Sequence, residues 1–166
     1  HAEVVYDAEH FFDGYRANPA YALQAIETAA KAGAKWIVMC DTNGGTLPEK
    51  IVEAVKAARS VLKIPVGIHC HNDCELAVAN SLAGVINGAR QIECAINGMG
   101  ERAGNAALEE IVMAIRTRSD IPVMAEVARC ESGFRHNLQN GLVLTGRVDS
   151  ADTGVMQINK RYHASA

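Results

Sequence analysis

The feature that most constrains this fold is a regular alternation of short, apolar, β-branched runs with longer stretches of helical period. The strand candidates cover residues 4–6, 36–40, 66–70 and 91–96, and they recur at intervals of about 25 to 30 residues. Strands that alternate with helices in this way are typical of β/α units on a parallel sheet. The sequence therefore predicts an α/β fold.

The expected helices begin at cap or proline residues and end near glycine, and they cover residues 18–33, 46–61, 73–88 and 106–116. Asn18 and Asp73 are expected N-caps, and Thr46 and Pro48 are expected to start the second helix. Gly33 and Gly88 open two similar turns, GAKWI and GARQI, so the chain repeats one β/α unit. Four such units make half of a (β/α)8 barrel, which needs about 250 residues in full. We therefore expect two open sheet edges, covered by a second copy in a homo-oligomer, by the remaining residues or by another partner.

The β/α rhythm ends after about Ser119, which predicts a domain boundary. Residues 1–118 form the expected half-barrel, and residues 119–166 form a second, small α+β unit. The second unit has a helix candidate at 123–129 and a hairpin-like stretch, QNGLVLTGRV.

Composition disfavours several kinds of partner. The formal net charge of -3 provides no basic surface for nucleic acid or an anionic membrane. No apolar run approaches the ~20 residues of a membrane span, and the first residues lack a signal-peptide pattern, so we expect a cytoplasmic protein. The five cysteines do not form a disulfide framework, so we expect reduced thiols. Cys70 should point away from the histidines beside it, which disfavours a cysteine-ligated zinc site.

The strongest local motif is GIHCHND, residues 67–73. His69 and His71 lie two apart on a predicted strand, so both side chains face one side and can share a metal ion. If the strand is parallel to its neighbours, the pair lies at its carboxyl end, where barrel enzymes place their sites. The alternative is that both are inward polar residues satisfied by neighbouring groups.

The glycine-rich segment NGMGERAGN follows the next strand candidate. Gly98 and Gly100 allow a backbone loop to cover a ligand, and Asn105 can offer an amide oxygen to a hard cation. The glycine spacing is not that of a dinucleotide-binding fingerprint. Glu101 and Arg102 could orient a carboxylate substrate or pair with each other on the surface. The segment could also serve only as a turn.

CDTNGGT places Asp41 and Thr42 at the end of another predicted strand. Thr42 could hydrogen-bond a keto acid there. The alternative is that Asp41 and Asn43 are ordinary turn-forming residues.

The motifs CDTNGGTLPE, GIHCHND and NGMGERAGN, in this order, resemble the acyl-CoA-dependent Claisen synthases. This family includes the 2-isopropylmalate, homocitrate and citramalate synthases, which are relatives of the hydroxymethylglutaryl-CoA lyases. The segments AEHFFDGYRANP and HNDCELAVANSL are most similar to citramalate synthase, and GERAGNAALEEIVMAIRTR is more similar to isopropylmalate synthase. The resemblance covers about residues 3–118.

The resemblance implies that a divalent cation (Mn, Mg or Zn) is held by His69, His71 and Asn105, three of the family's four ligands. It also implies that Thr42 lies at the keto-acid pocket and that Glu9 is an active-site glutamate. Glu101 and Arg102 are expected to contact the substrate. Gly98 and Gly100 are expected to contact acetyl-CoA. The family's fourth ligand, its substrate-polarising arginine and its distal His and Tyr have no matching segment, so we expect weak metal binding and little turnover.

The last 46 residues resemble a different family. RCESGFRHN and SADTGVMQINKRYH are similar to the start of lysozyme-like lytic transglycosylases, which implies that Glu131 is a general acid and that residues 154–157 line a sugar cleft. Such an acid needs burial to raise its pKa, and a segment this short is not expected to form the cleft alone.

The leading hypothesis is part of an acyl-CoA-dependent 2-keto acid synthase that condenses acetyl-CoA with pyruvate or a related 2-keto acid. One alternative is a peptidoglycan lytic transglycosylase that acts through Glu131. The other is a non-catalytic chimera.

Overall fold

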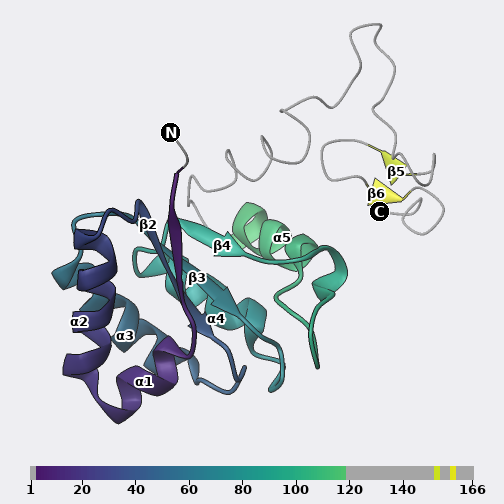
Figure 1. Cartoon of the computed structure of the whole chain (residues 1–166). Coiled ribbons are helices and arrows are strands. Elements are labelled where there is room, and N and C mark those ends of the chain that lie inside the picture. The colour runs from purple at the N-terminus through teal and green to yellow at the C-terminus, as the bar shows by residue number, and fades with distance from the viewer. Residues whose placement is uncertain (1–2, 119–151, 154–157, 160–166) are drawn as a thin grey trace, which may run out of the picture. The chain divides into compact units, whose positions relative to one another are not determined.

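A four-stranded parallel sheet organises the chain in the computed structural model, which describes residues 3–118, 152–153 and 158–159 (Figure 1). Its strands are β1 (Val5–Ala8), β2 (Trp36–Asp41), β3 (Val66–Cys70) and β4 (Gln91–Glu93), in the order β1-β2-β3-β4. Every pairing is parallel. This confirms the predicted α/β fold with the strand order of half a β/α barrel, and it leaves β1 and β4 as the two edges.

The helices that accompany the sheet are α1 (Phe11–Ala17), α2 (Pro19–Lys31), α3 (Pro48–Val61), α4 (Ala77–Ile86) and α5 (Leu108–Arg118). A short 3-10 turn, η1 (Ile96–Gly98), follows β4. The Asn18 side chain accepts the Tyr21 N–H at 3.1 Å, so Asn18 is the predicted cap of α2. Helix α1 was not predicted, and its Phe11 and Phe12 rings are buried edge to face with centroids 5.5 Å apart.

The predicted start of α4 was wrong, whereas α3 begins at Pro48 as predicted, although Thr46 does not cap it. Asp73 does not cap α4, which begins at Ala77, where the Asn72 side chain accepts the Ala77 N–H at 3.1 Å. Helix α3 begins after Leu47 without a side-chain cap, because the Thr46 hydroxyl donates to Asp41 at 2.7 Å. In both cases a contact to a loop or strand takes the side chain that the cap would have used.

The two faces of the sheet differ in what covers them. Ile37, Met39 and Ile68 are fully buried on the face that the helices cover. Helix α4 lies so close to this face that a Cβ at Gly84 would stand 2.6 Å from Ile68 Cδ1. Alternating residues of the same strands, including Cys40 and His69, point to the opposite face. That face is the inner side of a β/α barrel.

The chain divides into two compact units, His1–Ala114 and Ile115–Ala166. In the second unit, β5 (Asp152–Thr153) and β6 (Ile158–Asn159) pair antiparallel. The helix predicted at 123–129 and the hairpin-like stretch, residues 139–148, both lie outside the described residues. In the described parts of the chain, no helix combines the length and apolar character needed to cross a bilayer.

Replacing Ile68 with Ala is expected to destabilise the fold by about 2–5 kcal/mol, because a fully buried side chain loses its contacts and leaves a cavity. Ile86→Ala is the matched control, since Ile86 is 66% exposed and its truncation should change stability by less than about 0.5 kcal/mol. Urea unfolding followed by circular dichroism measures both. Equal midpoints for the two variants would contradict this description of the core.

Candidate metal centre

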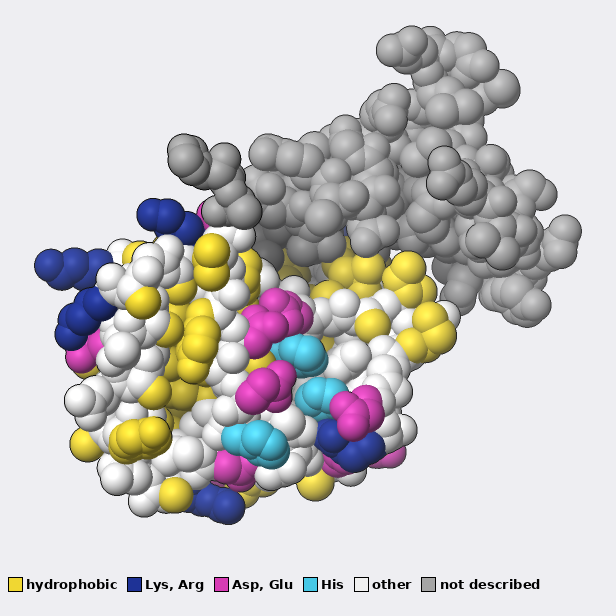
Figure 2. Space-filling view, in the orientation of Figure 1, with side chains coloured by type: hydrophobic (Ala, Val, Ile, Leu, Met, Phe, Trp, Pro, Cys, Tyr) yellow, Lys and Arg dark blue, Asp and Glu magenta, His cyan; other side chains and the backbone are white. Residues whose placement is uncertain are grey.

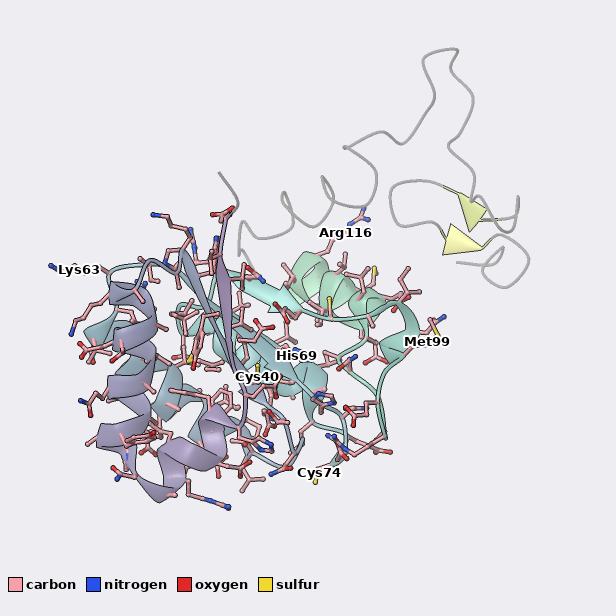
Figure 3. All side chains as sticks on the ribbon, viewed as in Figure 1. Cys40, Lys63, His69, Cys74, Met99 and Arg116 are labelled. Carbon is pink, nitrogen blue, oxygen red and sulfur yellow. The ribbon has the colours of Figure 1, made fainter. Side chains whose placement is uncertain are left out.

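His69 and His71 lie together at the carboxyl end of β3. The strand register pairs His69 with Cys40 on one side and with Glu93 on the other. The two imidazole rings stack with centroids 5.1 Å apart and planes 13° from parallel (Figure 3 labels His69). The predicted shared face of the histidines is therefore confirmed. Cys70 points the other way and is fully buried, and burial raises the pKa of its thiol to about 12.

Asn105 reaches this pair from the loop after β4. It forms an isolated antiparallel bridge with His71, and its Oδ1 lies 3.2 Å from His69 Nε2. Its Nδ2 donates to the Met99 carbonyl at 3.0 Å, which fixes the orientation of the amide. The structure thus brings together the three residues that the sequence nominated as cation ligands.

Glu93 holds the other side of the His69 ring, with 3.0 Å between its Oε2 and His69 Nδ1. The hydrogen bond to Glu93 is the main cause that raises the pKa of His69 above 6.5, and burial opposes it. The hydrogen bond to Asn105 raises this pKa further. Sequence reasoning missed Glu93, although strand alternation in QIECAI indicated that Gln91 and Glu93 share a face.

Carboxylates gather around His69. Burial raises the pKa of Asp7, repulsion from Glu93 and Glu9 raises it further, and His69 lowers it. Figure 2 shows acidic and histidine side chains clustered on one face of the molecule. Sequence reasoning missed Asp7, which lies on edge strand β1.

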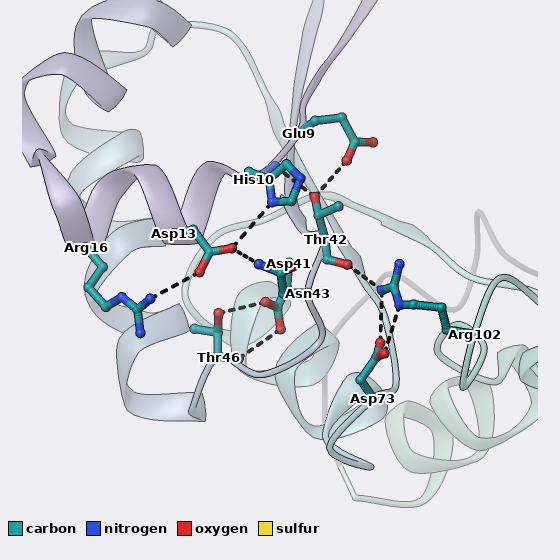
Figure 4. Close-up of polar contacts among 10 residues, drawn as sticks. All are labelled: Glu9, His10, Asp13, Arg16, Asp41, Thr42, Asn43, Thr46, Asp73 and Arg102. Carbon is teal, nitrogen blue, oxygen red and sulfur yellow. Dashed lines mark hydrogen bonds and ion pairs between the residues drawn. The ribbon is translucent and has the colours of Figure 1, made fainter.

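Thr42 and Glu9 meet beside this cluster (Figure 4). The Thr42 hydroxyl donates to Glu9 Oε2 at 2.7 Å and accepts the His10 N–H at 2.8 Å. Asp41 turns to the helix side, where it is buried and accepts the Thr46 hydroxyl and N–H. Asp41 therefore acts as a structural residue of the turn, and Thr42 is the residue of this strand end that lies at the site.

Arg102 takes Asp73 as its main partner rather than Glu101. Its Nε and Nη2 lie 2.8 Å and 3.0 Å from the two Asp73 oxygens, whereas its Nη1 is 3.7 Å from Glu101. Gly98 and Gly100 pack against Asn105: a Cβ at Gly98 would stand 2.9 Å from the Asn105 carbonyl oxygen, and one at Gly100 would be 2.9 Å from Asn105 Cγ. The glycines thus allow the loop to close over Asn105.

Two hollows lie near these loops. One of about 330 Å³ is lined by Asn72, Gly98, Asn105 and neighbouring residues, next to the candidate ligands. A larger hollow of about 570 Å³ lies between α1 and the start of α3, and neither histidine lines it.

The donor set suits a divalent cation. His71 Nδ1 is buried and has no hydrogen-bond partner in the described structure. Imidazole nitrogens and an amide oxygen are ordinary ligands for Zn and Mn. Among the described residues, no three His, Cys, Asp or Glu side chains are grouped so that they could hold a metal ion by themselves.

Glu131, nominated as a general acid, and the 154–157 motif lie outside the described residues. Their predicted role has no structural support here.

Comparison with known proteins places this arrangement in a family. The HMGL-like family model matches residues 4–133, a range that includes Glu131. The (R)-citramalate synthase of Aquifex aeolicus (strain VF5) is 54% identical over 125 residues, covering 75% of this chain and 24% of that protein. The 2-isopropylmalate synthase of Bradyrhizobium diazoefficiens is 49% identical over 124 residues, covering 71% and 23%.

A solved structure agrees on the fold. The carboxyl transferase domain from Rhizobium etli pyruvate carboxylase with oxalate superposes with a TM-score of 0.59 at 24% identity, covering 78% of this chain and 22% of that one. The chain spans only about a quarter of the length of the curated relatives it matches. The matched segment, the strand order and the motifs all indicate the same family, and the chain belongs to the HMGL-like family.

Proposed function

We propose that the chain serves a divalent-cation-dependent condensation of acetyl-CoA with a 2-keto acid such as pyruvate. The names of the two synthase relatives, at 54% and 49% identity, support this reaction class. In this proposal His69, His71 and Asn105 hold the cation, and the cytoplasmic location predicted from the sequence goes with it.

The observation that carries the proposal is the meeting of two acceptors. Glu93 accepts a hydrogen from His69 Nδ1, which leaves the lone pair of neutral His69 on Nε2. Nε2 faces the Asn105 oxygen at 3.2 Å, and Asn105 Nδ2 is committed to Met99. Two lone pairs that face each other need a proton or a cation between or beside them. A bound cation would satisfy both, with Glu93 as the carboxylate that orients the imidazole.

When bound, the cation would polarise the keto-acid carbonyl as a Lewis acid. The Thr42 hydroxyl has one hydrogen and gives it to Glu9, so a substrate oxygen that takes this hydrogen must displace the Glu9 carboxylate. Glu9 would then be released close to the substrate, where a carboxylate can accept a proton. Gly98 and Gly100 let the loop after β4 cover the substrate position, and we assign these two glycines to the binding of acetyl-CoA. Glu101 and Arg102 border it.

Calorimetric titration of Mn²⁺ or Zn²⁺ into the purified chain is expected to show saturable, weak binding at one site. The His69→Ala, His71→Ala double variant should abolish it, because two of the three proposed ligands are removed. Arg16→Gln is a control on α1, because the exposed Arg16 side chain pairs with Asp13 and not with a proposed ligand. Absence of binding to the unaltered chain, or unchanged binding in the double variant, would contradict the proposal.

Protons should compete with the cation at His69. Because the pKa of His69 is raised above 6.5, metal affinity should fall as pH drops through that raised value. Replacing Glu93 with Gln removes the main cause of the shift, so the His69 pKa, followed by ring-proton NMR in metal-free protein, should fall. Glu53→Gln is the control, since Glu53 pairs with exposed Lys50. An unchanged His69 titration in Glu93→Gln would show that the pair does not form.

We also propose that a second copy covers the open edges of the sheet. On edge strand β1, Val5 and Tyr6 are 44% and 39% exposed, an unusual exposure for a parallel strand. Light scattering of the purified chain should therefore give twice the 17.7 kDa mass of one copy, or more. A compact species of one chain mass would contradict this assembly.

A further inference from the structure

Three loops meet at Asp73. This residue does not cap α4, and it is not one of the proposed metal ligands. Arg102, from the loop after β4, grips both Asp73 oxygens at 2.8 Å and 3.0 Å. The same Arg102 Nη2 donates to the Thr42 carbonyl, in the loop after β2, at 2.5 Å. One guanidinium therefore joins the loops that follow β2, β3 and β4 (Figure 4).

The loop after β2 packs closely against the backbone of Asp73. Gly44 has φ +62°, and a Cβ there would stand 2.8 Å from the Asp73 nitrogen and 2.9 Å from the His71 oxygen. The Cys74 N–H donates to the Gly44 carbonyl at 3.1 Å. The loop after β2 thus packs against the backbone of Asp73 and holds it in place. The Arg102 side chain then attaches the loop after β4 to Asp73.

The loop that Arg102 fastens is the one that carries Asn105. Arg102 itself has φ +58°, a left-handed conformation that is strained for a residue other than glycine. The Gly104 carbonyl accepts the Asn72 N–H at 2.9 Å, and Asn105 follows directly. A strained residue persists when its contacts outweigh the strain, and the shortest contacts of Arg102 are those to Asp73 and Thr42.

We infer that Arg102 and Asp73 are positioning residues that hold Asn105 against His69, and that they set the affinity of the cation site without touching the cation. The bidentate geometry fixes direction as well as distance, which a lysine in place of the arginine cannot do. This inference rests on the proposed function for its cation, but the placement of Asn105 is a property of the metal-free chain.

The test compares Arg102→Gln, Arg102→Lys and Asp73→Asn with the control Arg16→Gln, whose charge pairs with Asp13 on α1 at 3.5 Å. In metal-free protein, the side-chain amide NMR signals of Asn105 and the ring signals of His69 should shift in the Gln and Asn variants and stay in place in the control. Arg102→Lys should show an intermediate shift. If these signals do not move in Arg102→Gln while the control is folded, the inference is overturned, whether or not the chain binds metal.

Metal affinity gives the second arm. Mn²⁺ binding should weaken about tenfold or more in Arg102→Gln, as for other residues that orient metal ligands. In an Asn105→Ala background the same substitution should have no further effect, because its action passes through Asn105. Additive losses would overturn the inference, since a general loss of structure adds in both backgrounds. Failure of the unaltered chain to bind Mn²⁺ would overturn the proposed function alone, and the NMR arm would still decide the role of Arg102.

Discussion

The parallel register of β3 with β2 and β4 is the constraint on which the rest of this structure depends. It sets His69 in one row with Cys40 and Glu93 and leaves His71 just past the strand end, where the bridge to Asn105 forms. A slip of one residue would turn both histidines into the helix layer and bring Ile68 to the inner face. The packing of Ile68 against Gly84 prevents that slip, so the hydrophobic layer fixes the geometry of the polar one.

The sequence predicted the sheet and most of the helices because their signals are periodic and local. Alternation and the repeated glycine turns identified all four strands, and Asn18 before Pro19 identified the start of α2. Helix α1 was missed because it has seven residues and no capping side chain at His10. The start of α4 was misplaced because Asp73 has a partner, Arg102, 29 residues away, and such a contact leaves no trace in local pattern.

The candidate site divides in the same way. Spacing alone showed that His69 and His71 share a face, and family resemblance nominated Asn105, Thr42 and Glu9. Glu93 and Asp7 were not found, because their importance depends on which strands are neighbours rather than on their own motifs. The double duty of Thr42, whose hydroxyl serves Glu9 and whose carbonyl serves Arg102, likewise required coordinates.

The charges on the inner face limit what can cover it. Burial raises the pKa of Asp7, repulsion from Glu93 and Glu9 raises it further, and His69 opposes this rise. Covering this face with apolar side chains would remove water from these carboxylates while they still repel one another, which is unfavourable. A surface that closes over the open half-barrel must therefore bring positive charge or hydrogen-bond donors to the carboxylates. A divalent cation at His69 and His71 lowers the same cost, because it places positive charge next to Glu93. Both cation binding and a covering surface with positive charge reduce the repulsion among these carboxylates. Cation binding should therefore favour covering of the inner face, and covering should favour cation binding.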